Sequence, residues 1–320
     1  MSTLESRKSQ YRTIYELLWS GNPRIYIKDI ASVLHVDSRT ASKRMQEAFD
    51  LGYIVGPHIR KRSYAAMKEH IYFVDCETPF ETYLQYSEDQ TTVYHARMVG
   101  FSNTWIISGK EIDIEGDVKV EGLRSDYFNT FAPNHSWEKA ILIMQKMVEH
   151  FAPEDYEPRG IIKTHWNETI DWDPECEKLY REFKYDLRKP LTPIMKKHLI
   201  SGQKIYEFLR KLPEYCTIST NYFPESVFTY DPYLFMFETD YEDFIIDLFS
   251  QLPTSSIFFK VSDRLFMRTY GEKQFLRHGN LPIAQVAQLR IPLLMRDLTE
   301  KGIIQSEDHA IIEYYWAKHI

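Results

Sequence analysis

The sequence predicts an α+β protein in which a helix-rich segment followed by a strand-rich segment occurs twice. Apolar residues recur at helical spacing in residues 11–49 and again in residues 174–212. In the stretches that follow, apolar residues alternate with a period of two. The hydrophobic content of 43% and aromatic content of 15% suffice for packed cores. We therefore expect the 320 residues to form several folded domains.

The first helix-rich segment has the element order of a winged helix-turn-helix. Three helices are expected, at Tyr11–Trp19, at Ile27–Leu34 and, after a turn at His35-Val36, from Ser38 to Gly52. Asp37 or Ser38 can cap the third helix. A strand, a turn and a wing are then expected at Tyr53–Val55, Gly56-Pro57 and His58–Arg62.

Charge supports a DNA-binding role for this segment. Residues 1–65 hold eleven Lys and Arg against six Asp and Glu, whereas residues 66–320 hold twenty-eight against forty. A basic end on an acidic body concentrates the attraction for phosphate there. The alternative is an ordinary solvated helix face. The expected DNA contacts are Ser38, Arg39, Thr40, Ser42, Lys43 and Arg44 on the third helix and Arg60, Lys61 and Arg62 on the wing.

The strand-rich segment that follows opens like a ferredoxin-like βαββαβ unit. A strand is expected at His70–Val74 and a helix at Pro79–Tyr86, and a hairpin joins Thr92–Met98 to Thr104–Ile107. The hairpin turn, at Gly100, Phe101, Ser102 and Asn103, is the candidate effector site because its glycine permits close approach of a ligand. The alternative is a simple turn.

The same order recurs about 160 residues later in degenerate form. Helices are expected at Pro174–Lys184, Thr192–Leu199, Gln203–Leu212, Tyr241–Leu252 and Leu281–Lys301, and strands at Tyr215–Thr220, Tyr233–Phe237, Ser256–Lys260, Leu265–Thr269 and Ile311–Trp316. No basic wing follows the second helix-turn-helix, so we expect it to be structural. The predicted domains are a winged helix-turn-helix at 1–66, a βαββαβ domain at 67–135, a helix and linker at 136–172, a second helix-turn-helix at 173–230 and a second βαββαβ domain at 231–320.

Two stretches of the sequence resemble a known protein family. IKDIASVLHVDSRTASKRMQEAFDLGYI and FETYLQYSEDQTTVYHARMVGFSNTWIIS resemble the feast/famine transcription regulators of the Lrp/AsnC type. The resemblance implies a DNA-binding head and an effector-binding, oligomerising sheet domain. Asn103 stands where that family usually has an acidic residue.

A related lineage, the siroheme decarboxylases, keeps this architecture and works as an enzyme on tetrapyrrole carboxylates. That resemblance implies roles for histidine and basic residues, here His95 and Arg97 on a strand and His58 and Arg60 near the wing. A single histidine on a strand is more often structural, so both interpretations of His95 stay open.

The sequence carries no pattern typical of a disulfide framework, a metal site or a catalytic nucleophile. Cys76, Cys176 and Cys216 lie far apart and form neither a disulfide framework nor a zinc pair. The sequence has no phosphate loop, nucleophile elbow or metal-ligand spacing, so no cofactor and no metal are expected. No apolar run reaches membrane-spanning length.

The main expectation is therefore a cytoplasmic regulator that binds double-stranded DNA as a homodimer or larger oligomer, with a small-molecule effector at the interface of its sheet domains. The alternatives are an enzyme on the same scaffold and a non-catalytic sensor.

Overall fold

The chain folds as two units, and each unit is built from two stretches that lie far apart in the sequence. The computed structural model describes residues 3–20, 22–272 and 291–317. The first unit is formed by Met1–Lys61 with Ile170–Thr229, and the second by Arg62–Thr169 with Tyr230–Ile320.

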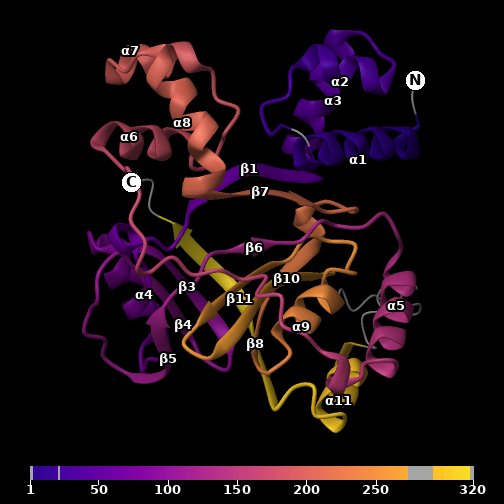
Figure 1. The fold of residues 1–320 in the computed structure, drawn as a ribbon, viewed down its shortest axis with the longest axis vertical. Helices are drawn as coiled ribbons and strands as arrows, with labels where there is room; N and C mark the ends of the chain where they lie inside the picture. The colour runs from indigo at the N-terminus through magenta and orange to yellow at the C-terminus, as the bar shows by residue number, and fades with distance from the viewer. Residues whose placement is uncertain (1–2, 21, 273–290, 318–320) are drawn as a thin grey trace. The chain divides into compact units, whose positions relative to one another are not determined.

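The first unit contains two sets of three helices, and each set runs into a strand (Figure 1). The first set is α1 (Leu4–Ser20), α2 (Ile27–Leu34), α3 (Ser38–Asp50) and strand β1 (Ile54–Lys61). The second set is α6 (Pro174–Phe183), α7 (Leu191–His198), α8 (Gly202–Tyr215) and strand β7 (Cys216–Tyr222). The expected helices of both segments are present, with ends that shift by a few residues.

The turn between the second and third helix has the same construction in both sets. His35 (φ 53°) and Leu199 (φ 56°) each adopt the left-handed conformation that ends a helix. Asp37 then accepts a hydrogen bond from the Thr40 N–H at 2.9 Å, and Ser201 accepts one from the Lys204 N–H at 3.2 Å. These caps explain why α3 and α8 begin where they do.

The expected strand, turn and wing of residues 53–62 are one continuous strand instead. β1 pairs antiparallel with β7 along its length, and the register shifts between Val55 and His58. Gly56 lies in this bulge with φ +104°, and a Cβ there would stand 2.5 Å from the Ser219 carbonyl oxygen. The prediction of a separate wing was wrong because β7, 160 residues away, supplies a partner that the local sequence does not reveal.

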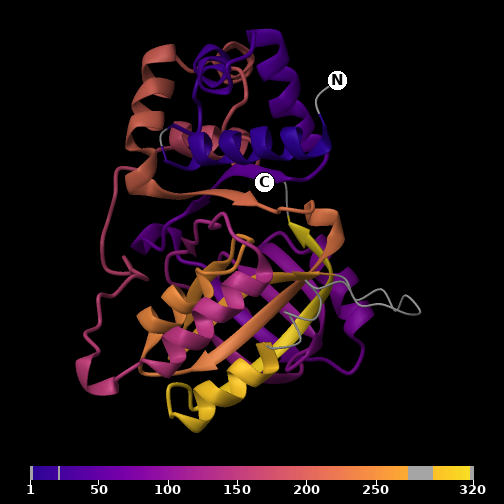
Figure 2. The same cartoon turned by 90° about the vertical axis from the view of Figure 1, so that its right-hand side faces the viewer.

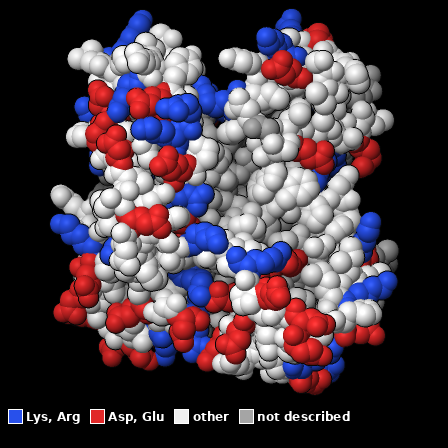
Figure 3. All heavy atoms as spheres, viewed as in Figure 1, with Lys and Arg blue, Asp and Glu red and all other residues white. Residues whose placement is uncertain are grey.

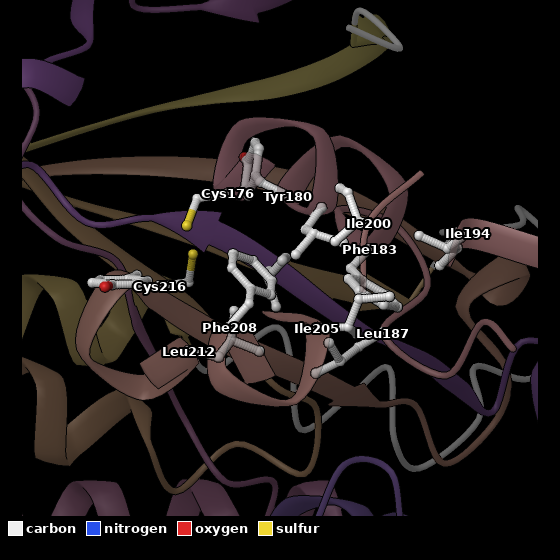
Figure 4. Packing of buried hydrophobic residues seen from close by; sticks show 13 residues of the cluster. Cys176, Tyr180, Phe183, Leu187, Ile194, Ile200, Ile205, Phe208, Leu212 and Cys216 are labelled. Carbon is white, nitrogen blue, oxygen red and sulfur yellow. The ribbon is translucent and has the colours of Figure 1, made fainter. Parts of the chain in front are cut away.

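Through the pairing of β1 with β7, each strand also packs against the helices of the other set. α1 packs against β7, and α6 packs against β1. Ile59 of β1 is fully buried in the cluster formed by the second set, which includes Phe183, Ile205 and Phe208 (Figure 4). Cys176 and Cys216 belong to the same cluster and are free thiols.

The second unit is built on a nine-stranded antiparallel sheet with the order β5-β2-β4-β3-β11-β8-β10-β9-β6. Its strands are β2 (His70–Asp75), β3 (Thr92–Gly100), β4 (Thr104–Ser108), β5 (Asp117–Leu123), β6 (Phe128–Asn129), β8 (Tyr230–Glu238), β9 (Ile257–Val261), β10 (Arg264–Glu272) and β11 (Ser306–Ala317). β3 and β11 join the two halves of the sheet by antiparallel pairing.

The two halves of the sheet follow one plan. The first half runs β2, α4 (Pro79–Glu88), β3, β4, β5, and the second runs β8, α9 (Glu242–Phe249), β9, β10, α11 (Ile291–Glu300), β11. In both, the last strand lies beside the first, followed by the third and the second. They differ in one respect, since residues 109–116 between β4 and β5 form no helix. The expected helix Leu281–Lys301 is described only from Ile291, and its earlier part lies outside the described residues.

The sheet curls so that its two ends approach each other. A bridge between Arg124 and Val261 links the chain after β5 to β9. The inner face carries a continuous core that includes Phe73, Ala96 and Phe266. α4 packs against β3 on the outer face, and α5 (Trp137–Glu149) and α11 lie against each other, as Figures 1 and 2 show. No described helix combines the length and apolar character needed to cross a bilayer.

Candidate functional site

The inner face of the curled sheet carries polar and aromatic side chains from strands of both halves. On β3, Tyr94 packs with Ala96 and Met98 against the inner core, because alternate residues of a strand share a face. Trp105 of β4 belongs to the same core. Tyr94, Trp105, Tyr127, Arg268, Tyr270 and Tyr315 form what we call the Arg268 cluster.

Aromatic rings surround the guanidinium of Arg268. Its Cζ atom lies 5.4 Å from the ring centre of Tyr315 and 5.7 Å from that of Tyr270. The ring of Tyr94 lies 4.8 Å from Trp105 and 5.9 Å from Tyr315, measured between centroids. These distances suit cation–π contacts and ring packing. The cluster is therefore one connected group.

Three polar atoms of the cluster are buried and have no hydrogen-bond partner among the described residues: Arg268 Nε, Tyr94 Oη and Trp105 Nε1. An unsatisfied buried donor costs about 1–3 kcal/mol, and more when it is charged. Folded proteins rarely tolerate several such atoms on one surface unless a ligand or water satisfies them. Their grouping on one face of the sheet makes this face the candidate binding site.

The electrostatics of the cluster favour an anion. Burial opposes the charge of Arg268, but the neighbouring tyrosines, Tyr270 and Tyr94 first, offset this and raise the pKa of the guanidinium. Burial also raises the pKa of the Tyr94 hydroxyl, which Arg268 only partly counteracts. At neutral pH the site therefore presents a cation and a protonated phenol.

The cluster contains no carboxylate. Among the described residues, no carboxylate is one of the groups that shift the pKa of Arg268, which are all tyrosines. A cation that is mostly removed from water is stabilised by a counter-ion with good hydrogen-bond geometry. A carboxylate attached to an aromatic body would suit this cluster. Its oxygens would accept hydrogen bonds from Arg268, Tyr94 and Trp105, and its rings would pack on the aromatic side chains. The described residues hold no group of three or more His, Cys, Asp or Glu placed to bind a metal ion.

His95 and Arg97 lie on the opposite face of the same strand. His95 is buried beneath α4, its ring 4.4 Å from that of Tyr83 and its Nε2 3.2 Å from Ser87 Oγ. Burial lowers the pKa of His95 to about 4, so it is neutral at physiological pH. Arg97 donates to Tyr314 Oη and forms an ion pair with Glu313 at 2.9 Å. The structure does not bring these two residues to the Arg268 cluster.

The expected DNA contacts on α3 fall into two groups. Ser38, Arg39, Ser42 and Lys43 have exposed side chains. Thr40 is half-buried, and its hydroxyl donates to Asp37. Arg44 donates to Gln10 at 2.8 Å and pairs with Glu47 at 2.7 Å, with a side chain that is only 12% exposed.

Arg60, Lys61 and Arg62 all have partners within the chain. Arg60 donates to the Lys184 carbonyl, and its guanidinium lies 5.3 Å from the ring centre of Tyr185. Lys61 pairs with Glu177 at 2.6 Å, and Arg62 pairs with the buried Asp126 at 2.6 Å.

His58, the remaining residue proposed near the wing, is half-buried beside Tyr185. Burial lowers the pKa of its imidazole to about 4, with a smaller contribution from Arg60. It belongs to the first unit, as Arg60 does, whereas the strands that carry the Arg268 cluster belong to the second.

The candidate effector turn is fastened to the sheet. Gly100 pairs with Ala310 of β11, and Phe101 packs with Phe73 and Phe266. The Asn103 amide exchanges hydrogen bonds with the backbone of Cys76, at 2.9 and 2.8 Å. Ser102 is fully buried.

The Arg268 cluster was not found from the sequence. Its signal is the alternation in the strand RLFMRTYGE, which places Phe266, Arg268 and Tyr270 on one face. The alternation does not show that this face is the inner one, nor that Tyr94 of the distant strand β3 lies opposite. A cation at a core-facing strand position is the one feature that could have indicated a site.

The comparisons with known proteins bear on the fold. No family model matches the chain, and no curated protein matches it. A crystal structure of the siroheme decarboxylase NirDL matches 97% of this chain and 92% of its own, with a TM-score of 0.50 and 13% sequence identity. The fold resembles that of a siroheme decarboxylase. A second structure of NirDL, in co-complex with an iron-uroporphyrin III analogue, has a TM-score of 0.47 at 12% identity.

The match extends over both units and both halves of the sheet, because it covers nearly the whole chain. The architecture is a mixed α+β one with a curled antiparallel sheet. At this identity the likeness concerns the fold alone.

Proposed function

We propose that this protein is an enzyme that removes carboxyl groups from a tetrapyrrole, with the inner face of the curled sheet as its active site. The buried, unpartnered donors around Arg268 carry this proposal, since they are suited to a carboxylate. The fold adds support, because it resembles that of the siroheme decarboxylase NirDL over 92% of that chain. We further propose that the chain consists of two helix-turn-helix units, joined by the β1–β7 pair, and two ferredoxin-like units, paired through β3 and β11.

Arg268 is proposed to hold a carboxylate that is not lost in the reaction. An ion pair to the departing carboxylate would stabilise the ground state more than the transition state and slow the loss of CO2. A tetrapyrrole with several acidic side chains offers separate groups for anchoring and for reaction. Trp105, Tyr94 and Tyr315 provide aromatic surface beside the anchor.

The proposed reaction needs no change of oxidation state. The bond between the carboxyl carbon and its neighbouring methylene breaks, and CO2 leaves. The electron pair stays on the methylene carbon, conjugated with the pyrrole ring, until a proton adds there and gives a methyl group. Tyr94 keeps its proton at neutral pH and is the proposed donor, reprotonated from solvent.

The decisive experiment is anaerobic incubation of the purified full chain with siroheme, followed by mass spectrometry for loss of CO2. Arg268→Gln and Tyr94→Phe are expected to lower the rate by about tenfold or more, because each removes a donor from a buried site. Arg97→Gln is the matched comparison, since Arg97 lies on the outer face of the same sheet.

Two results would contradict the proposal. If wild-type protein neither binds nor decarboxylates siroheme, the tetrapyrrole assignment is wrong. If Arg97→Gln loses activity while Arg268→Gln retains it, the chemistry belongs to the outer face. Thermal unfolding of each variant separates loss of activity from loss of fold.

DNA binding is a second candidate function, favoured by the exposed set Ser38, Arg39, Ser42 and Lys43 on α3. An exposed helix face of this composition is suited to phosphates and base edges. The proposed arrangement includes an effector near Gly100–Asn103 and assembly into a dimer or larger oligomer. Arg39→Ala combined with Lys43→Ala should abolish binding of the protein to the DNA upstream of its own gene at about 0.15 M salt. Unchanged binding would remove α3 from this account.

A further inference from the structure

The first unit contains a cavity of about 560 Å³, and no residue of the Arg268 cluster lines it. One wall is the connection between α1 and α2, residues 22–27, and another is α8. Leu187, Arg188 and Leu191 complete it from the connection between α6 and α7. Its volume falls in the range of small-molecule sites, about 300–1,000 Å³.

The floor of the cavity is apolar and its mouth is aromatic. Leu191, Leu209 and Ile218 line it and also pack against the core of the second helix set. Tyr26 and Tyr206 line it as well, with 69% and 66% of their surface exposed. Large exposed aromatic residues beside an apolar cavity are typical of ligand sites.

Three arginines line the cavity, and no acidic residue does. Arg24 donates to the carbonyls of Leu187 and Lys189, and Arg188 donates to those of Pro23 and Ile25. These reciprocal contacts fix both guanidinium groups at the wall. Burial lowers the pKa of both guanidinium groups. Asp186, which does not line the cavity, partly offsets this because its negative charge raises the pKa of each.

Arg210 differs from the other two arginines. Its side chain is exposed on α8, and within the part of the chain that the structure describes it has no ion-pair partner. Glu207, on the next turn of α8, is engaged by Lys211 at 3.3 Å. Arg210 is therefore free to pair with an incoming anion.

We propose that this cavity binds a small molecule with an aromatic or other apolar body and one acidic group. The body would lie against Leu191, Leu209 and Tyr206, and the acid would pair with Arg210 at the mouth. Because the walls come from both helix sets, an occupant would hold the α1–α2 connection to α8 and stabilise the pairing of the two sets.

The test uses 1-anilinonaphthalene-8-sulfonate and its uncharged counterpart N-phenyl-1-naphthylamine, followed by fluorescence on the full chain. The sulfonate should bind more tightly than the uncharged probe. Arg210→Gln should weaken sulfonate binding by about threefold to tenfold and leave the uncharged probe unaffected. Tyr206→Ala should weaken both probes. Arg296→Gln, an exposed arginine on α11, is the matched control and should change neither.

The titrations are repeated in the Arg268→Gln background, because the Arg268 cluster also attracts aromatic anions. Sulfonate binding that is lost with Arg268→Gln and unchanged by Arg210→Gln would overturn the cavity proposal and leave the proposed enzyme activity standing. Equal affinity for the two probes would also overturn it. Absence of siroheme turnover in the wild-type protein, together with an intact Arg210 effect, would support the cavity and count against the enzyme.

Discussion

Tyr94 and His95 are neighbours in the chain, yet they face opposite sides of the same sheet. Tyr94 joins the Arg268 cluster, whereas His95 is buried under α4. The two arginines Arg268 and Arg97 are divided in the same way. At the scale of the residue, chemical type therefore says little about role until the face is known.

Arg44 illustrates the same point within α3. It links α3 to α1 by donating to Gln10 and pairs within α3 with Glu47, to which Tyr11 of α1 also donates at 3.1 Å. Arg44→Ala is expected to lower the free energy of unfolding by about 1–2 kcal/mol, because charge-assisted hydrogen bonds at a mostly buried side chain are lost. Urea unfolding measures the change.

Arg39→Ala is the control for that prediction. Arg39 is exposed on the same helix, and its loss should change the free energy of unfolding by no more than about 0.5 kcal/mol. Equal effects of the two substitutions would show that Arg44 does not hold α1 against α3.

At the scale of the element, the β3–β11 pairing depends on Gly100. A Cβ at this position (φ +153°) would lie 2.1 Å from the His309 carbonyl oxygen. Gly100→Ala should therefore lower the free energy of unfolding by about 1–3 kcal/mol, because β11 has to move away. Denaturant unfolding combined with hydrogen exchange at β11 measures the effect.

Gly109→Ala provides the comparison for Gly100. A Cβ at Gly109 meets nothing closer than 3.9 Å, so the substitution should be nearly neutral. A stable Gly100→Ala protein with unchanged exchange at β11 would contradict the proposed joint between the two halves of the sheet.

Asp173 connects α6 to α8 and makes this connection sensitive to pH. It accepts from the Cys176 N–H at 2.7 Å and pairs with Lys204 at 2.5 Å. Burial alone would raise the pKa of Asp173, but these hydrogen bonds outweigh it and lower the pKa from 3.8 to about 2. A depressed carboxyl pKa contributes stability above the unfolded value, and this contribution is lost as the pH falls through the folded value.

Asp173→Asn tests this pH dependence. Asparagine keeps the helix cap but cannot pair with Lys204 as an anion. The wild type should lose more stability than the variant between about pH 5 and about pH 2, as read from urea midpoints. Identical slopes for the two proteins would mean that Asp173 contributes nothing to acid unfolding.

At the scale of the whole molecule, each half of the sequence depends on the other. β1 finds its partner in β7, and β3 finds its partner in β11. Residues 1–169 expressed alone would leave both strands with an unpaired edge, which favours aggregation. Gel filtration should therefore show a soluble species only when residues 1–169 and 170–320 are produced together. A monomeric, cooperatively melting fragment 1–169 would contradict this interdependence.

The sequence by itself determined the local elements. Helical spacing of apolar residues, the cap at Asp37 and the alternation in β2 to β4 predicted most helices and strands, because these signals act within a few turns or residues. The sequence also indicated the repeat and the resemblance to an enzyme lineage with this fold.

Only the tertiary structure decided which distant segments pair. Strand pairing between residues that lie more than 150 positions apart leaves no local signal, so the continuous β1–β7 pair replaced the expected wing. For the same reason Arg268 and Tyr94 came together on an inner face that neither strand reveals on its own. The alternation of residues along a strand shows which side chains share a face. Only the packing of the whole sheet determines which face is enclosed.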